Sequence, residues 1–210
     1  MILLQGISKS PNLCDLIIRR WTFEQQEAAA FRDMLRATQT LNNIRLQELQ
    51  DDSGAFLSVE LPRALETNYT LLNLNYYERT EDVQNVFAIR DALRQNLSLL
   101  HRATRFVVPP VSDSKKVASA FEKVRKSRAL VTNVSRISGL SEPEAIQAVK
   151  LRSHYLDENF MNLARVVKQK VVCRREGAGD CPVQLDEIGL DCWLKVTSYL
   201  RLSGAVVARH

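Results

Sequence analysis

The chain has 210 residues, 45% of them apolar, and a formal net charge of +5, so it can bury a core in one domain or two small ones. The opening residues lack a basic leader, and no run of about 18 apolar residues occurs, so we expect a cytoplasmic or nuclear protein without membrane contact. Four cysteines are too few for a disulfide framework, and Cys173, Cys181 and Cys192 match no common zinc-binding spacing.

An internal repeat organises the first half of the chain. Its anchors are Leu13, Leu41, Leu71 and Leu99, which are separated by 28, 30 and 28 residues. Ten residues before the anchors stand Leu3, Phe31, Leu61 and Ile89, and six before them stand Ile7, Leu35, Leu65 and Leu93. Three residues after them stand Leu16, Ile44, Leu74 and Arg102, and five after them stand Ile18, Leu46, Tyr76 and Thr104. Of these 20 positions 18 are apolar, whereas the composition of the chain would give about 9. The number of apolar residues at these positions is thus about twice the number expected by chance, which indicates a repeat.

Each unit of this repeat is predicted to be a helix followed by a short strand. Positions four apart before the anchor share a helix face, and positions two apart after it share a strand face. Helices are expected over residues 24–36, 54–66 and 82–95, with a kink or a shortened start at Pro62. Stacked units would bury a core between a helical layer and a parallel sheet, which is an α/β fold. The alternative is an ordinary αβ or helical domain in which the spacing is accidental.

The best copy of the pattern is Leu65-Glu-Thr-Asn68-Tyr-Thr-Leu71-Leu-Asn-Leu74-Asn-Tyr76. It resembles the long, ribonuclease-inhibitor-like type of leucine-rich repeat, and the resemblance covers residues 1–105. It implies a short leucine-rich-repeat solenoid with parallel strands on the concave side and helices on the convex side. The family usually has Asn or Cys eight residues after the anchor, where this chain has Trp21, Leu49 and Arg79. That departure indicates divergent repeats with an altered turn.

The first repeat unit begins without a preceding strand or cap. Leu3 and Ile7 already occupy helix positions, although a repeat array needs a polar cap at its end. Two explanations remain: the chain is a fragment of a longer repeat protein, or Leu3, Leu4 and Ile7 form an open apolar edge. We favour the fragment.

The resemblance implies a binding surface on the concave side of the strands. Residues two, four and six after each anchor face solvent there because strand side chains alternate. The candidate protein-binding residues are Asp15, Arg19, Asn43, Arg45, Gln47, Asn73, Asn75, Tyr77, His101 and Arg105, with Ile17 and Ala103 among them. This polar, arginine-containing surface suits a protein partner. A solvated sheet without a partner is the alternative.

The second half of the chain is predicted to be α-helical. Pro109-Pro110 marks a boundary between repeats over residues 1–108 and a helical extension over 109–176, and residues 177–210 add a loop and an amphipathic helix. Helices are expected over residues 115–126, from Ser141 to about residue 151, over 157–172, and over 185–202. Residues 114–175 hold 14 Lys or Arg against 5 Asp or Glu, so the basic character lies in this part.

Two alternative functions belong to this half. The last helix is similar to the start of an F-box, which would dock on a ubiquitin-ligase adaptor through Ile188, Trp193, Val196 and Tyr199. Residues 131–151 are arranged like a helix-turn-helix around Gly139, with Lys150 and Arg152 on its second helix, which is the nucleic-acid alternative.

No catalytic machinery is recognisable in the sequence. His101, His154 and His210 fit no metal-ligand spacing, and the seven glycines form no phosphate loop. We therefore expect a non-catalytic interaction scaffold that has a protein partner, no metal, no cofactor and no small-molecule substrate.

Overall fold

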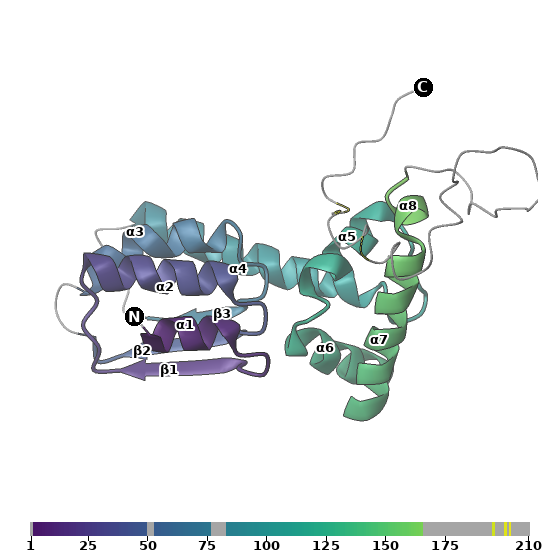
Figure 1. Cartoon of the computed structure of the whole chain (residues 1–210), viewed down its shortest axis with the longest axis horizontal. Coiled ribbons are helices and arrows are strands. Elements are labelled where there is room, and N and C mark those ends of the chain that lie inside the picture. Colours follow the sequence, from purple (N-terminus) through teal and green to yellow (C-terminus); the bar gives the residue numbers. More distant parts are fainter. Residues whose placement is uncertain are drawn as a thin grey trace, which may run out of the picture.

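The computed structural model describes residues 2–49, 53–76 and 83–165, together with Lys195, Leu200 and Leu202. Within these residues the fold is α/β. A three-stranded parallel sheet with a layer of helices on one face forms the first part, and a group of helices forms the second (Figure 1). None of the described helices is both long enough and apolar enough to cross a bilayer.

The described elements alternate between helix and strand and then become purely helical. In the first part they are α1 (Ile2–Lys9), β1 (Asp15–Arg19), α2 (Gln25–Ala37), β2 (Asn43–Gln47), α3 (Ser53–Leu65), β3 (Asn73–Asn75) and α4 (Val83–Thr104). The second part holds α5 (Lys115–Val124), α6 (Arg128–Ser138), α7 (Glu142–Glu158) and α8 (Phe160–Leu163). The predicted helices over residues 24–36 and 54–66 are thus confirmed to within a residue at each end. Pro62 lies inside α3 without shortening its start.

The strands pair in the register that the repeat predicts. The sheet order is β1-β2-β3, with both pairs parallel. Leu16 is opposite Ile44, and Ile44 is opposite Leu74, so equivalent positions of successive units are neighbours. At the start of the strands, the Asn42 and Asn43 amides both donate to the Cys14 carbonyl, and the Leu72 and Asn73 amides both donate to the Asn42 carbonyl. The spacing of the repeat is therefore not accidental.

The apolar positions of the repeat form the first of two cores. Fully buried members include Phe31, Leu35, Leu41, Ile44, Leu61 and Leu71, which come from the helices, anchors and strands. Leu3 is an exception, because 59% of it is exposed while its neighbour Leu4 is buried. The apolar edge expected from Leu3, Leu4 and Ile7 is therefore reduced to Leu3 and the half-buried Ile7.

Buried amide side chains join one repeat unit to the next. Asn68 donates to the Leu35 carbonyl at 2.7 Å, and its own side-chain oxygen accepts from the amides of Thr70 and Leu71. Asn96 donates to the carbonyls of Asn68 and Leu71. Because buried backbone groups need partners, these side chains satisfy groups at the ends of helices and turns.

The turns after β1 and β2 have apolar residues at the position where the resemblance implies Asn or Cys. Trp21 and Leu49 stand where the family has Asn or Cys, and both pack against the first core. Arg20 and Glu48 precede them in the left-handed conformation, with φ of 53° each, and form an exposed ion pair of 2.7 Å. Apolar packing thus occupies these two turns, while Arg79 lies outside the described residues.

The predicted fourth strand is wrong. The residues after Leu99 continue α4 as far as Thr104, so His101 lies on a helix and Arg105 directly follows it. The reason is that Arg102 and Thr104 break the apolar alternation of a strand. Asn96, Leu100, Ala103 and Thr104 are instead buried at helical spacing.

The second core begins within α4. Leu93 packs against the first core, whereas Leu99 and Leu100 pack against the second, together with Phe106, Phe121 and the apolar faces of α5 to α8. Tyr69 and Leu72 from the repeat region also pack against the second core. The change of core therefore occurs inside α4, while the domain boundary expected at Pro109-Pro110 stays a prediction.

Three helix predictions in the second part can be compared with the structure. In α5 the expected apolar stripe of Val117, Ala118, Phe121 and Val124 is buried, and α7 begins with the expected capping box between Ser141 and Glu144. The continuous helix expected over residues 157–172 is wrong, because α7 ends at Glu158 and α8 is followed by Arg165 with a φ of 61°. Val166, Val167 and most of residues 185–202 lie outside the described residues.

Candidate functional site

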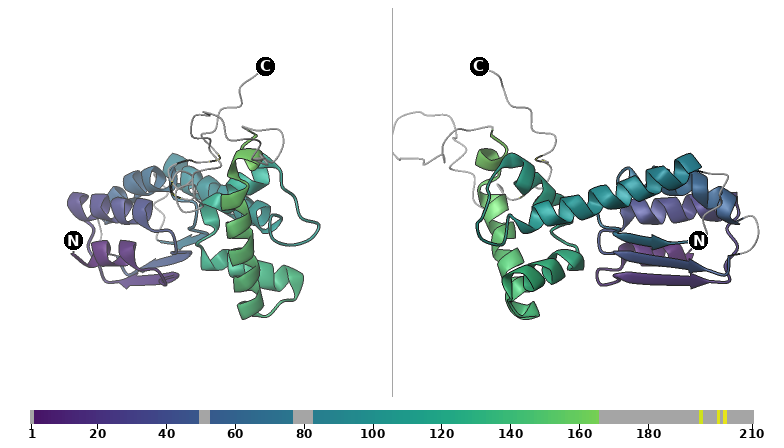
Figure 2. Two further views of the ribbon diagram at one scale, coloured as in Figure 1. Left: turned by 45° about the vertical axis from the view of Figure 1, so that its right-hand side comes forward. Right: turned by 180° about the vertical axis from the view of Figure 1, so that it is seen from behind.

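The face of the sheet opposite the helices is open to solvent. Along β1 and β3, exposed side chains alternate with half-buried ones. Along β2, buried side chains alternate with side chains that are exposed or half-buried. The helices cover one face of the sheet (Figure 2), and the apolar set Leu16, Ile18, Ile44, Leu46 and Leu74 packs in the core on that side. The alternate set therefore lies on what we name the open face. It consists of Asp15, Ile17, Arg19, Asn43, Arg45, Gln47, Asn73 and Asn75.

Polar side chains on the open face contact one another from strand to strand. Asn43 donates to Asp15 at 2.6 Å, and the Arg19 guanidinium donates to Gln47 at 2.8 Å. In contrast, Arg45 is exposed and forms no hydrogen bond or ion pair with any residue that the structure describes. The open face thus offers one uncommitted guanidinium beside a fixed row of amides and one carboxylate.

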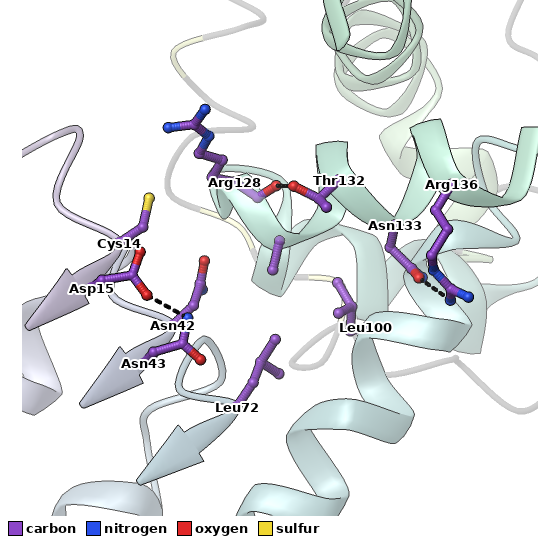
Figure 3. A pocket seen from close by; sticks show the side chains of 11 residues that line it. Cys14, Asp15, Asn42, Asn43, Leu72, Leu100, Arg128, Thr132, Asn133 and Arg136 are labelled. Carbon is purple, nitrogen blue, oxygen red and sulfur yellow. Dashed lines mark hydrogen bonds between the residues drawn. The ribbon is translucent and has the colours of Figure 1, made fainter. Parts of the chain in front are cut away.

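Helix α6 stands at the amino ends of the strands and closes one side of the open face. A pocket of ≈ 360 Å³ lies between them, which we name the strand-end pocket (Figure 3). Its sheet side consists of Cys14, Asp15, Asn42, Asn43 and Leu72, and its helical side consists of Leu100, Arg128, Ala129, Thr132, Asn133 and Arg136.

The polar residues of α6 face this pocket because of their spacing. Arg128, Thr132 and Arg136 are four residues apart, which places them on one side of the helix. Arg128 pairs with Glu142 at 3.0 Å, but both side chains are more than half exposed, so the pair is a weak one. Arg136 donates to the Asn133 side chain at 2.8 Å. The pocket thus has two guanidinium groups at its solvent edge.

Hydrogen bonds fix α6 relative to the sheet. The Asn42 side chain donates to the Ser127 hydroxyl at 2.9 Å and to the Thr70 carbonyl at 2.9 Å. Asn133 donates to the Thr104 hydroxyl of α4 at 2.7 Å, in a buried position. Since these polar groups are buried, breaking either contact would leave them unsatisfied. The strand-end pocket is therefore preformed.

The charges of the site are mostly positive. The described members of the open face and the strand-end pocket include four arginines, Arg19, Arg45, Arg128 and Arg136, and one acidic residue, Asp15. Such an arrangement attracts acidic groups and repels basic ones.

The structure brings together seven of the ten predicted concave-face residues. Asp15, Arg19, Asn43, Arg45, Gln47, Asn73 and Asn75 lie on adjacent strands. His101 and Arg105 do not join them, because α4 replaces the fourth strand. Tyr77 and the adaptor-docking residues Ile188, Trp193, Val196 and Tyr199 lie outside the described residues, so those expectations stay predictions.

Sequence reasoning missed the contribution of α6. The four-residue spacing of Arg128, Thr132 and Arg136 is visible in the sequence, but nothing local indicates that this side of the helix meets the strand ends. Of the two cations in the nucleic-acid alternative, Lys150 is exposed. Arg152 instead bonds the Phe106 carbonyl and Asp113 and stacks on the rings of Phe106 and Tyr155.

No group of three His, Cys, Asp or Glu side chains suited to a metal ion occurs among the described residues. Comparison with known proteins gives no match: no family model fits the chain, and neither a curated protein nor a solved structure is similar to it.

Proposed function

We propose that this chain is a non-catalytic protein-interaction module, built as a short leucine-rich-repeat solenoid, that binds a protein partner on the open face and the strand-end pocket. The observation that carries the proposal is the row of polar side chains at equivalent repeat positions. These side chains are exposed or half-buried on adjacent parallel strands, directly beside a pocket edged by Arg128 and Arg136.

The dimensions of the open face favour a short segment of the partner. Three strands span about 10 Å and five residues span about 16 Å, from the spacings within a sheet. This is far below the roughly 800 Å² that each partner contributes to a stable interface, so the pocket and α6 have to add contact area. We therefore expect an extended segment or a loop of the partner, bound with about micromolar affinity.

The chemistry of the site favours an acidic, hydrogen-bonding segment. Arg45 and Arg136 would meet carboxylates, and the amides of Asn73 and Asn75 would bond backbone or side-chain amides of the partner. Ile17, half exposed among these polar groups, provides one apolar contact on β1. A site of mixed polarity such as this is typical of transient protein interfaces.

A peptide-display selection tests this proposal without a known partner. Random 12-residue peptides are selected on the full chain, and binders are measured against Arg45→Glu/Arg136→Glu. The expected result is enrichment of acidic peptides whose affinity falls at least tenfold in this variant, because two attractive contacts become repulsive. The matched control is Lys126→Glu/Lys150→Glu, which reverses two exposed cations outside the site and should leave affinity within about twofold.

Peptides that bind the two variants equally would refute the site. A selection that enriches no sequence at all would instead support the alternative of a solvated sheet face. Circular dichroism spectra of both variants are compared with the parent, so that loss of fold is not taken for loss of binding.

A further inference from the structure

A second pocket lies between α4 and α5, and its lining shares no residue with the strand-end pocket. Its volume is ≈ 530 Å³, within the range of about 300–1,000 Å³ found for small-molecule sites. Five cationic side chains from three separate segments line it: Arg102 of α4, Lys115, Lys116 and Lys123 of α5, and Arg165 after α8. No acidic side chain of the described residues lines it.

The positive charges of this pocket are mostly not neutralised. Arg102, Lys116 and Arg165 are exposed and form no ion pair with any described residue. The Lys123 ammonium lies 4.1 Å from the centre of the Tyr69 ring, which leaves its charge in place. Glu122, which directly precedes Lys123, accepts a hydrogen bond from the Leu202 amide. Like charges that converge on one cavity repel each other, so a bound anion would relieve an existing cost.

The start of α5 adds to the same potential. Its first turn contains no acidic residue, and Lys116, which forms no ion pair with any described residue, lies at the positive end of the helix dipole. Ser114 caps the helix by accepting from the Val117 amide, and it lines the pocket as well. Cations at this end of a helix are unfavourable unless an anion accompanies them.

Apart from Ser114 and Ser119, the rest of the lining is apolar. Leu99, Ala120 and the fully buried Leu202 lie among the cations. We infer from this combination that the pocket binds a phosphorylated small molecule with a ring or other apolar portion, of the size of a nucleoside di- or triphosphate. The phosphates contact the five cations, and the apolar portion contacts the leucines. This inference departs from the sequence-based expectation that no small molecule is bound.

A small ligand fits the arrangement better than a nucleic-acid strand does. A strand needs cations spread along its length, with one contact per successive phosphate. Here the cations of three segments converge on one cavity. Elsewhere in the basic half, Arg125 and Arg152 are committed to Asp157 and Asp113.

Titration calorimetry of the full chain with magnesium-free ATP tests the inference. Adenosine serves as the uncharged probe, and a 20-base-pair DNA duplex as the nucleic-acid probe. The expected result is saturable 1:1 binding of ATP, at least tenfold weaker binding of adenosine, and weaker binding of the duplex per site. In Arg102→Ala/Lys116→Ala, ATP affinity should fall at least tenfold. The matched control Lys126→Ala/Lys150→Ala also loses two cations and should stay within twofold.

A third variant separates binding from folding. Arg165 has a φ of 61°, a conformation in which glycine is unstrained, so Arg165→Gly should keep or raise the melting temperature while weakening ATP binding at least threefold. No saturable ATP binding at 1 mM would overturn the inference, as would equal binding of adenosine or equal losses in the two double variants. A duplex that binds more tightly than ATP would reassign the surface to nucleic acid and overturn it too.

Discussion

Asn68→Ala is expected to lower the free energy of unfolding by about 3 kcal/mol. The Asn68 side chain is 2% exposed and makes three hydrogen bonds, to the Leu35 carbonyl at 2.7 Å and from the amides of Thr70 and Leu71 at 3.1 and 2.8 Å. Each hydrogen bond contributes about 1 kcal/mol net, and more where a buried partner is left unsatisfied. The sum is a large part of the roughly 5–15 kcal/mol by which a domain is stable.

Urea denaturation followed by circular dichroism measures this loss. With a slope of about 2 kcal/mol per M, the midpoint should fall by about 1.5 M. Asn75→Ala is the matched control, because Asn75 is exposed on the open face, and it should change stability by less than about 0.5 kcal/mol. If Asn68→Ala were as stable as the control, the argument that buried amides join one unit to the next would be wrong.

Three further predictions concern the second part of the fold. Gly139→Ala should lower the free energy of unfolding by about 1–2 kcal/mol in the same urea assay, because Gly139 ends α6 at a φ of 71°. The new methyl group would meet no atom within 4 Å, so the loss comes from the backbone conformation alone. An unchanged free energy of unfolding would contradict this. Hydrogen bonds from the hydroxyl and the backbone of Ser141 lower the pKa of Glu144. The contribution of Glu144 to stability is therefore present above its pKa in the unfolded chain and is lost as the pH falls through its pKa in the folded chain. An NMR titration should find that pKa raised in Ser141→Ala, and an unchanged value would count against the capping box. Burial, and then the hydrogen bond to Asp113, raise the pKa of Tyr155. Its contribution to stability is therefore complete below the unfolded pKa and is lost as pH rises through the folded pKa. Phenolate absorbance should appear at lower pH in Asp113→Asn, and an unchanged onset would contradict a role for this hydrogen bond.

Where two signals agree, the sequence predicts this fold well. The repeat predicts the positions of Leu16, Ile44 and Leu74, and the alternation of apolar residues predicts the face of the sheet on which they lie. The structure places these residues opposite one another on neighbouring parallel strands. The fourth unit shows the limit of the pattern. Leu99 keeps the anchor position, but Arg102 and Thr104 no longer favour a strand, so packing onto the second core determines the helix.

The candidate site was predictable only where it lies on the repeat. Asn43 and Arg45 follow from strand alternation, whereas Arg128 and Arg136 reach the site through contacts between distant segments. The Asn42 side chain bonds Ser127 across 85 positions of the chain, and no local pattern indicates such a contact. The cationic pocket has the same origin, since Arg102 and Arg165 are 63 positions apart in the sequence and meet only in the folded chain.

Helix α4 determines how α6 is oriented over the strand ends. It has 22 residues, a length of about 33 Å, and contributes to both cores, so its turns transmit position from one to the other (Figure 1). Inserting one residue between Asn96 and Leu99 would rotate everything beyond by about 100° and advance it by about 1.5 Å. Arg128 and Arg136 would then no longer line one pocket with the amino ends of β1 and β2. The relative orientation of α6 and the sheet thus depends on the number of residues in α4, in addition to their identities.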